Sequence, residues 1–277
     1  MTLLERNTIF KAGLLLPAAA LFWVALTSFL IIPVYPAVLN ETARRSAGVI
    51  QTLVAHFFQP NPYAPFASIA GAVLYAFITI IFIYRYFEKT QSPEIFYIAF
   101  FVLSFALEGS RIMVPLKLKY GLPSVYLIMA SRALIFGRYF GIFSLFAASI
   151  YAAGLDLQKQ MPVVFIIALI TLMIAREVPI DGLSWDSSFC MISGYTSMFT
   201  IVEGGIVLIT LVSFLISAYS RGIKEYLFIG IGAFLVILGR TLLFSADTWI
   251  TPFPALLSLA AGTWFICTQL HQVYLWF

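Results

Sequence analysis

Eight long apolar stretches fill nearly all of the 277 residues. A membrane-spanning helix needs about 20 mostly apolar residues, and each stretch has about that length. Hydrophobic residues make up 62% of the chain and charged residues 10%, whereas soluble domains contain roughly half and a quarter. The connections are too short to hold a further domain, which usually needs about 50 residues. The sequence therefore predicts one all-α integral membrane domain, residues 1–277, folded as a polytopic transmembrane helix bundle.

Prolines and capping residues mark the predicted span boundaries. Ser92 precedes Pro93 and Glu94, an arrangement typical of a helix start. Pro17 lies inside the first stretch and predicts a kink there. The eight predicted spans are Phe10–Ile32, Ala64–Tyr86, Glu94–Pro115, Pro123–Ala153, Pro162–Val178, Tyr195–Tyr219, Tyr226–Ala246 and Phe253–Phe277.

The distribution of Lys and Arg in the short connections predicts the orientation. Cytoplasmic connections usually carry more of these residues than outer ones. The balance is slightly more favourable with the N-terminus in the cytoplasm, and an even number of spans then returns the C-terminus to the same side. We expect a multi-pass protein of the plasma membrane or the bacterial inner membrane, with both termini cytoplasmic.

The segment of about residues 40–58 has a helical pattern of its own. Ala43, Ile50 and Phe57 recur at helical spacing, while Glu41 and Arg44 fall on other sides. This pattern predicts an amphipathic helix that lies in the outer interface of the membrane. The helix serves either as a lid or partner platform, or only as a cover for the ends of the bundle.

The sequence contains a weak internal similarity. A shift of 129 residues aligns Arg111 with Arg240 and Pro123 with Pro252 without a gap. Two units of four spans would point the same way, as in transporters with parallel repeats. The alternative is a chance match between apolar spans. The half-repeats would be residues 1–153 and 154–277.

Six ionisable residues lie inside the predicted spans. All four cations are Arg, although the chain also contains Lys. A guanidinium group stays charged and binds a carboxylate or phosphate in a bidentate way. Charge at membrane depth is costly and is a functional-site hypothesis by default. The six residues are Glu108, Arg111, Arg132, Arg138, Glu203 and Arg240.

Counting residues from the span ends at 1.5 Å each predicts which side chains meet. Glu108 and Arg132 fall at similar depths on consecutive spans, and so do Glu203 and Arg240. We therefore predict one Glu–Arg pair in each half of the chain. Arg111, three residues after Glu108 on the same helix face, would complete a triad with the first pair.

Four arginines and two glutamates leave two positive charges unbalanced, with Arg138 predicted to lie deeper and to have another partner. One interpretation is a cavity open to the outside that binds a carboxylate, a phosphate or a lipid headgroup. The other is a set of structural ion pairs that fixes the helix register, with the spare arginines bonded to carbonyl groups or water.

Small residues mark two further places on the spans. Ala133, Gly137 and Gly141 recur at four-residue spacing and predict close helix packing, with homodimerisation as the alternative. Gly204 and Gly205 follow Glu203 directly. They mark either a helix break of the kind found in transporters or another packing surface.

Several classes of protein find no support in the sequence. The two histidines, His56 and His271, are too few for a metal or haem site, so no metal or cofactor is expected. Lys and Arg are scattered, which argues against nucleic acid as a partner. Cys190 and Cys267 are predicted to be free, because they would lie at different depths. No serine or cysteine has a histidine beside it to activate it.

These observations favour a non-enzymatic membrane module, the sensing or anchoring subunit of a larger assembly, with an Arg and Glu site in its outer half. The expected partners are the lipid bilayer, other protein subunits and an anionic small molecule or lipid headgroup. A small secondary transporter for an anionic substrate is the first alternative. A lipid-processing membrane enzyme is the second.

Overall fold

The computed structural model describes residues 3–32, 61, 63–88, 90, 92–154 and 160–275. It is 83% helical, which confirms the all-α prediction. Eight of its helices are long and apolar enough to cross a membrane, judged by length and composition. The predicted amphipathic helix at about residues 40–58 lies outside the described residues.

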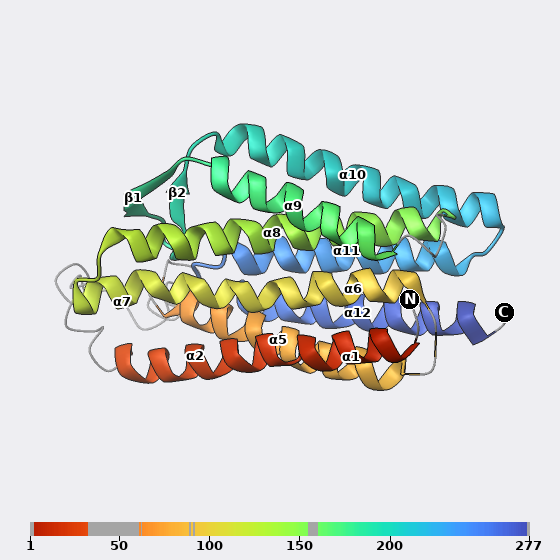
Figure 1. The fold of residues 1–277 in the computed structure, drawn as a ribbon, viewed down its shortest axis with the longest axis horizontal. Coiled ribbons are helices and arrows are strands. Elements are labelled where there is room, and N and C mark those ends of the chain that lie inside the picture. The colour runs from red at the N-terminus through yellow and green to blue at the C-terminus, as the bar shows by residue number, and fades with distance from the viewer. Residues whose placement is uncertain are drawn as a thin grey trace, which may run out of the picture.

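The helices run side by side along the long axis of the molecule (Figure 1). The described helical elements are α1 (Leu3–Gly13), α2 (Leu15–Ile31), α5 (Ala64–Tyr86), α6 (Pro93–Ser104), the 3₁₀ helix η1 (Phe105–Ile112), α7 (Met113–Tyr120), α8 (Ser124–Ala152), α9 (Gln160–Glu177), α10 (Thr196–Arg221), α11 (Glu225–Phe244) and α12 (Pro252–Leu275).

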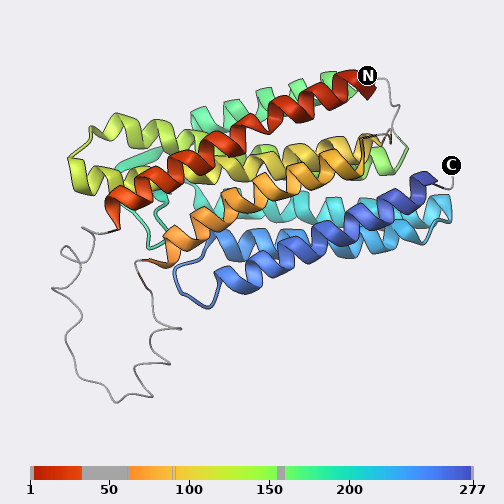
Figure 2. The same cartoon turned by 90° about the horizontal axis from the view of Figure 1, so that it is seen from below.

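The two ends of the bundle differ. At one end α1 begins and α12 ends, and we call it the terminal end (Figures 1 and 2). At the other end the chain forms a small antiparallel hairpin of β1 (Ile180–Trp185) and β2 (Met191–Ser193), and we call it the hairpin end. An even number of long helices returns the chain to the end at which it began.

The third long helical segment, α6 with η1 and α7, occupies the centre of the bundle. It packs against α8, α5 and α2, and more of it is buried than of any other candidate span among the described residues. Phe105 is fully buried and contacts the rings of Phe101 and Tyr75. This central position explains why the charged residues of the segment are buried.

One flank of the bundle, formed by α9 and α10, is largely exposed and apolar. α10 packs on α8 and α11 through one side only. On its other side Ile201, Leu208 and Leu215 are exposed. A wide apolar surface of this kind suits a lipid environment or a partner helix rather than water.

The first span contains the irregularity that Pro17 predicts. α1 ends at Gly13 and α2 begins at Leu15, so the helix is interrupted at Leu14. Pro17 has no backbone N–H for the carbonyl group of Gly13, and its ring crowds that carbonyl group. The start of α6 also follows its prediction, because the Ser92 side chain accepts a hydrogen bond from the backbone N–H of Ile95 at 3.3 Å.

The third span is longer and less regular than predicted. It continues through Pro115 to Tyr120 and ends at Gly121, which has a φ of +62° in the left-handed region. Lys117 and Lys119 lie in the last helical turn. Gly after the last turn and Lys within it are ordinary signals of a helix end. The prediction that this span ends at Pro115 is therefore wrong.

The hairpin was absent from the sequence prediction. The Asp186 carboxylate accepts hydrogen bonds from the backbone N–H groups of Ser188 at 3.0 Å and Cys190 at 2.8 Å, which closes the turn. Lys117 fixes β1 by donating to the carbonyl oxygen of Gly182 at 3.2 Å. Asp is common in such turns because its side chain mimics a backbone acceptor.

Candidate functional site

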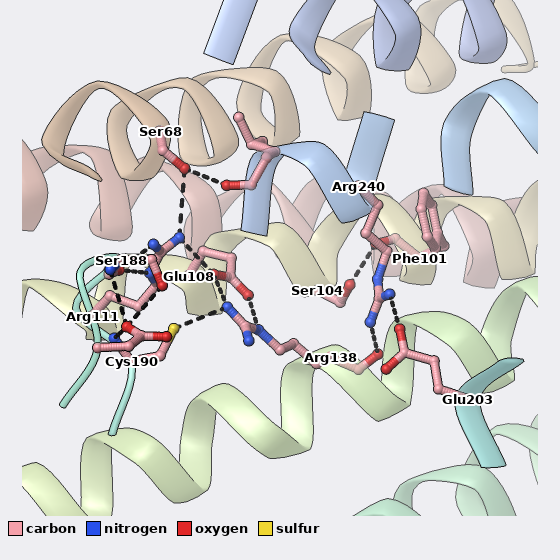
Figure 3. A network of polar contacts seen from close by, with 12 residues as sticks. Ser68, Phe101, Ser104, Glu108, Arg111, Arg138, Ser188, Cys190, Glu203 and Arg240 are labelled. Atoms are coloured by element: carbon pink, nitrogen blue, oxygen red, sulfur yellow. Dashed lines mark hydrogen bonds and ion pairs between the residues drawn. The ribbon is translucent and has the colours of Figure 1, made fainter. Parts of the chain in front are cut away.

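Glu108, on η1, is the centre of a buried charged network. Arg138 of α8 binds it with two hydrogen bonds, from Nε to Oε1 at 2.8 Å and from Nη2 to Oε2 at 3.0 Å. Arg111 reaches Oε2 of the same carboxylate at 3.3 Å, which confirms the predicted contact between residues three apart. One carboxylate therefore serves two guanidinium groups (Figure 3).

The predicted pair of Glu108 with Arg132 is wrong, because Glu108 lies deeper than a regular α-helix ending at Pro115 would place it. Measured from Tyr120, eight α-helical and four 3₁₀ steps place Glu108 about 20 Å from the hairpin end of its helix. Arg138 lies fourteen residues from Ser124, about 21 Å, whereas Arg132 lies about 12 Å from it. Glu108 is thus level with Arg138.

Arg132 does not join the network. Its side chain is exposed on α8, and it makes no ion pair within the described part of the chain. Without Arg132, three arginines and two glutamates remain, and together they carry a net charge of one positive unit. We use the name charged network for these five residues, Glu108, Arg111, Arg138, Glu203 and Arg240.

The second predicted pair is confirmed. Arg240 of α11 donates from Nη1 to Oε1 of Glu203 on α10. Its Nη2 atom also donates to the backbone carbonyl oxygen of Arg138 at 3.0 Å. The Glu108–Arg138 pair and the Glu203–Arg240 pair therefore form one network instead of two separate sites. Arg111 and Arg240, which the 129-residue shift aligns, both belong to it, while the repeat itself stays a prediction.

The aromatic ring of Phe244 contacts the guanidinium groups of both Arg138 and Arg240. The guanidinium carbon of Arg138 lies 4.5 Å from the ring centroid, and that of Arg240 lies 4.7 Å from it. Cations are attracted to an aromatic face, and more strongly when water is excluded. Phe244 thus stabilises two like charges that would otherwise repel each other across a short distance.

The hairpin closes the network at one side. Arg111 donates from Nε to the carbonyl oxygen of Ser188 at 2.9 Å, and Nη2 donates to the same oxygen. Arg138 Nη2 lies 3.3 Å from the sulfur atom of Cys190. Arg111 also reaches Ser68 of α5 at 3.5 Å (Figure 3). The charged network therefore joins the hairpin to the helices.

A cavity of about 520 Å³ opens beside the charged network, between α8, α10, α11 and the hairpin. We call it the hairpin pocket. Arg138 and Glu203 line it with side chains that are 25% and 36% exposed, whereas Arg240 is 3% exposed. Its volume falls in the usual range of small-ligand sites, about 300–1,000 Å³. The remaining lining residues are Asp186, Ser188, Cys190, Thr200, Gly204, Val207, Ile237, Thr241, Phe244 and Ser245.

A smaller cavity of about 220 Å³ lies between α8 and α10. Arg138, Thr200 and Glu203 line this cavity as well as the hairpin pocket. Glu203 therefore lines both cavities, although its Oε1 atom is bound by Arg240. The exposed part of the carboxylate is available to a ligand.

The arrangement provides charge and shape rather than an activated nucleophile. Cys190, Ser188 and Thr200 line the hairpin pocket, and the described residues of its lining include no histidine. His271 contacts the rings of Tyr86 and Phe87 instead. Among the described residues, no three His, Cys, Asp or Glu side chains cluster in a way that would hold a metal ion.

The small residues of α8 pack as predicted. A Cβ atom added at Gly137 would lie 2.9 Å from Cβ of Leu107 and 3.2 Å from the carbonyl oxygen of Ser104. Gly141 approaches the side chain of Ser104 equally closely, and Ala133 is half-buried one turn before Gly137. The prediction of close packing is confirmed, and this packing brings Arg138 within reach of Glu108.

The interpretation of Gly204 and Gly205 as a helix break is wrong. Both residues lie inside α10, which is a regular helix from Thr196 to Arg221. The interpretation of these glycines as a packing surface is also wrong within the described chain. A Cβ atom added at either glycine would meet nothing within 4 Å. The irregular segment is η1, on another span, and it carries two members of the charged network.

Sequence reasoning missed the part of the site that the hairpin supplies. Ser188 contributes a backbone carbonyl group, and Cys190 appeared only as a free cysteine in a connection. The structure confirms that Cys190 and Cys267 are both free. The one available signal was Asp186 followed by two serines, a pattern typical of a tight turn.

A second polar cluster, also missed, lies at the terminal end. Glu94 is 2% exposed and accepts hydrogen bonds from Tyr274 at 2.6 Å, Ser92 at 3.0 Å and Tyr226 at 3.3 Å. Arg221 in turn donates to the hydroxyl group of Tyr226 at 3.2 Å. Three hydroxyl groups satisfy this carboxylate and join α6, α11 and α12.

Comparisons with known proteins add one partial similarity. No protein family matches the chain, and no solved structure matches it. An uncharacterised protein of Treponema pallidum (strain Nichols) is 27% identical to it over 142 residues. The aligned region is 51% of this chain and 39% of that relative's length. The similarity therefore indicates no activity.

Proposed function

We propose that this chain is a non-enzymatic integral membrane module that binds a small anion in the hairpin pocket and serves as the sensing subunit of a larger assembly. The observation that carries the proposal is the surplus positive charge of the charged network beside a cavity of about 520 Å³. The network contains three arginines and two glutamates, so the anionic group of a ligand can pair with its surplus positive charge.

The energetic argument is the cost of an unbalanced charge inside a bilayer. A single charged side chain at the centre of a membrane helix costs about 2.5–3.5 kcal/mol on insertion scales. Arg111 is enclosed by Glu108 and the hairpin, and Arg240 by Glu203. Arg138 keeps a partly exposed guanidinium group at the pocket wall, and its Nη1 atom makes no hydrogen bond within the described residues.

The shape of the pocket supports binding of a small molecule. Val207, Ile237 and Phe244 add apolar side chains to its lining. Ligand sites are mostly apolar, with a few polar groups that fix the orientation. The ligand expected here therefore has one anionic group and a short apolar part.

The same pocket also suits an alternative function, that of a small secondary transporter for an anion. Transport would be favoured by a cavity that reaches both Arg132 and Arg240 and by an unwound helix at Gly204. The hairpin pocket reaches Arg240, but Arg132 is not part of its lining and α10 is regular at Gly204. The geometry therefore favours a receptor over a carrier.

The surroundings of the module follow from its surface. The exposed apolar flank of α9 and α10 supports a position in the plasma membrane or a bacterial inner membrane, where lipid or another subunit covers it. In this proposal both termini are cytoplasmic and the hairpin end faces outward. The partner that receives the signal would contact this flank or the cytoplasmic ends of the helices.

The proposal is tested by ligand-induced stabilisation of the full chain purified in detergent. Propanoate, 4-methylpentanoate and inorganic phosphate are titrated while thermal unfolding is followed. At least one anion is expected to raise the unfolding temperature in a saturable way, while the uncharged 4-methylpentanamide leaves it unchanged. Binding adds RT ln(1 + [L]/Kd) to the stability of the folded state.

Variants locate the binding to the pocket. Arg138→Gln is expected to weaken anion binding by about tenfold or more, because it removes a charge-assisted hydrogen bond. Arg132→Gln is the matched control, since it removes the same group from the same helix outside the pocket, and it should bind normally. Equal loss in both variants, or no stabilisation by any anion in the unaltered chain, contradicts the proposed function. Uptake of the bound anion by proteoliposomes would favour transport instead.

A further inference from the structure

We propose that the ligand of the hairpin pocket is a zwitterion with a primary ammonium group beside its anionic group. The inference rests on the proposed function and specifies its ligand class. Its chemical basis is that the pocket presents a guanidinium group and two carboxylates to the same open space: Arg138, Glu203 and Asp186 all line it.

Glu203 keeps unused hydrogen-bonding capacity toward the cavity. Its Oε1 atom is occupied by Arg240, whereas its Oε2 atom accepts no hydrogen bond within the described residues. The side chain is 36% exposed and lines both cavities. A ligand that carries only negative charge would meet this carboxylate unfavourably, whereas an ammonium group would pair with it.

Asp186 supplies a second acceptor at the mouth of the pocket. Its Oδ1 atom closes the hairpin turn by accepting from Ser188 and Cys190. Its Oδ2 atom accepts no hydrogen bond among the residues that the structure describes, and the residue is exposed. An ammonium group has three donors. Asp186 thus adds a second negative group to the pocket lining, besides Glu203.

The anionic group of the ligand belongs beside Arg138. The Nε and Nη2 atoms of this residue are held by Glu108, which leaves Nη1 as the donor without a partner among the described residues. Arg240 adds positive potential, although Glu203 and the carbonyl group of Arg138 occupy its Nη atoms. The pocket lining thus carries both positive and negative groups, and a ligand with both charges can pair with both.

Two sources share this ligand chemistry. A free α-amino acid carries a carboxylate and an ammonium group, and the headgroup of phosphatidylethanolamine carries a phosphate and an ammonium group. The apolar side chains of Val207, Ile237 and Phe244 suit the side chain of the first or the upper part of the second. The experiment therefore has a soluble arm and a lipid arm.

The soluble arm uses matched triples on the full chain in detergent. Glycine, L-alanine and L-leucine are each compared with the acid that lacks the amino group, namely acetate, propanoate and 4-methylpentanoate. They are also compared with the amine that lacks the carboxylate, namely methylamine, ethylamine and 3-methylbutylamine. At least one amino acid is expected to bind about tenfold more tightly than its acid and its amine, by calorimetry or thermal stabilisation.

The lipid arm uses the same protein in nanodiscs of equal parts phosphatidylethanolamine, phosphatidylglycerol and phosphatidylcholine, followed by release into detergent and native mass spectrometry. Preferential retention of phosphatidylethanolamine supports the inference and identifies the source as lipid. Phosphatidylglycerol has the phosphate without an ammonium group, and phosphatidylcholine has an ammonium group without N–H donors. Both should be retained less.

Two variants separate the ammonium contact from the anion contact. Glu203→Gln keeps an oxygen acceptor for Arg240 but removes the negative charge, and Asp186→Asn keeps the turn acceptor. Each should remove most of the advantage of the zwitterion over its acid while the acid itself still binds. Glu177→Gln, at an exposed acid outside the pocket lining, is the matched control and should keep the full advantage.

The outcomes separate this inference from the proposed function. If acids bind as tightly as their amino acids and phosphatidylglycerol is retained as well as phosphatidylethanolamine, the zwitterion is refuted while the anion site stands. If no acid, amino acid or lipid binds, both are refuted. An unchanged preference for the zwitterion in Glu203→Gln and Asp186→Asn would also overturn the inference.

Discussion

At the scale of single residues, Glu108 decides the arrangement of the site. Its carboxylate is 1% exposed and binds two arginines from different helical segments. Replacing a buried ion pair by apolar groups is often harmless, but removing one partner leaves a buried charge without compensation. The residue is therefore expected to be far less tolerant of substitution than the exposed charges.

We predict that Glu108→Gln lowers the stability of the folded chain by about 3–5 kcal/mol, because Arg111 and Arg138 would then face each other without a carboxylate between them. The measurement is the thermal unfolding midpoint in detergent, followed by tryptophan fluorescence. Arg132→Gln, an exposed cation without an ion pair among the described residues, should change the stability by no more than about 0.5 kcal/mol. A Glu108→Gln midpoint equal to that of Arg132→Gln would show that the network contributes nothing to stability.

At the scale of elements, the pairing of α8 with the third long helical segment brings the charges together. Gly137 and Gly141 allow α8 to approach Ser104 and Leu107, and the 3₁₀ helix η1 lengthens the third segment just where Glu108 lies. A 3₁₀ helix rises about 2.0 Å per residue instead of 1.5 Å. The register of Glu108 with Arg138 thus depends on a local change of helix type.

We predict that Gly137→Ala destabilises the chain by about 1–3 kcal/mol, because the added methyl group would lie 2.9 Å from Leu107 and 3.2 Å from a backbone oxygen that cannot move freely. Gly205→Ala is the matched control, since nothing lies within 4 Å of the added atom. It should be neutral or stabilise helix α10 by up to about 1 kcal/mol. Unfolding midpoints in detergent check both variants, and equal effects would contradict the assigned packing.

At the scale of the whole molecule, the two cysteines distinguish the hairpin end from the bundle interior. Cys190 lines the hairpin pocket and is partly exposed, whereas Cys267 is fully buried in α12. The proposed orientation places the hairpin end outside the cell. A thiol reagent that does not cross membranes therefore reports on both the fold and the orientation.

We predict that a membrane-impermeant maleimide added to intact cells labels Cys190 and leaves Cys267 unmodified. Cys190→Ser is expected to abolish labelling, and Cys267→Ser is expected to leave it unchanged. Labelling of Cys190 only after the cells are opened would reverse the proposed orientation. Labelling of Cys267 in the folded chain would contradict its burial in the bundle.

The sequence by itself determined the all-α class, the eight apolar helices, the Glu203 to Arg240 pair and the close packing at Gly137. The all-α class, the apolar helices and the packing at Gly137 depend on local composition and on short spacings along one helix, and residue types report such properties directly. The Glu203 to Arg240 pair joins two helices, α10 and α11, and depends on the depth of each residue. The Glu203 to Arg240 pair was found because both residues lie near the ends of regular helices, where counting at 1.5 Å per residue is accurate.

Only the tertiary structure decided that Glu108 binds Arg138, that the two pairs form one network and that a hairpin covers it. The physical reason is that contacts between helices depend on their relative register, which accumulates every error in helix length and type. A span extended by a few residues through Pro115 and a 3₁₀ segment moved Glu108 by about one or two helical turns. That distance was enough to exchange one arginine partner for another.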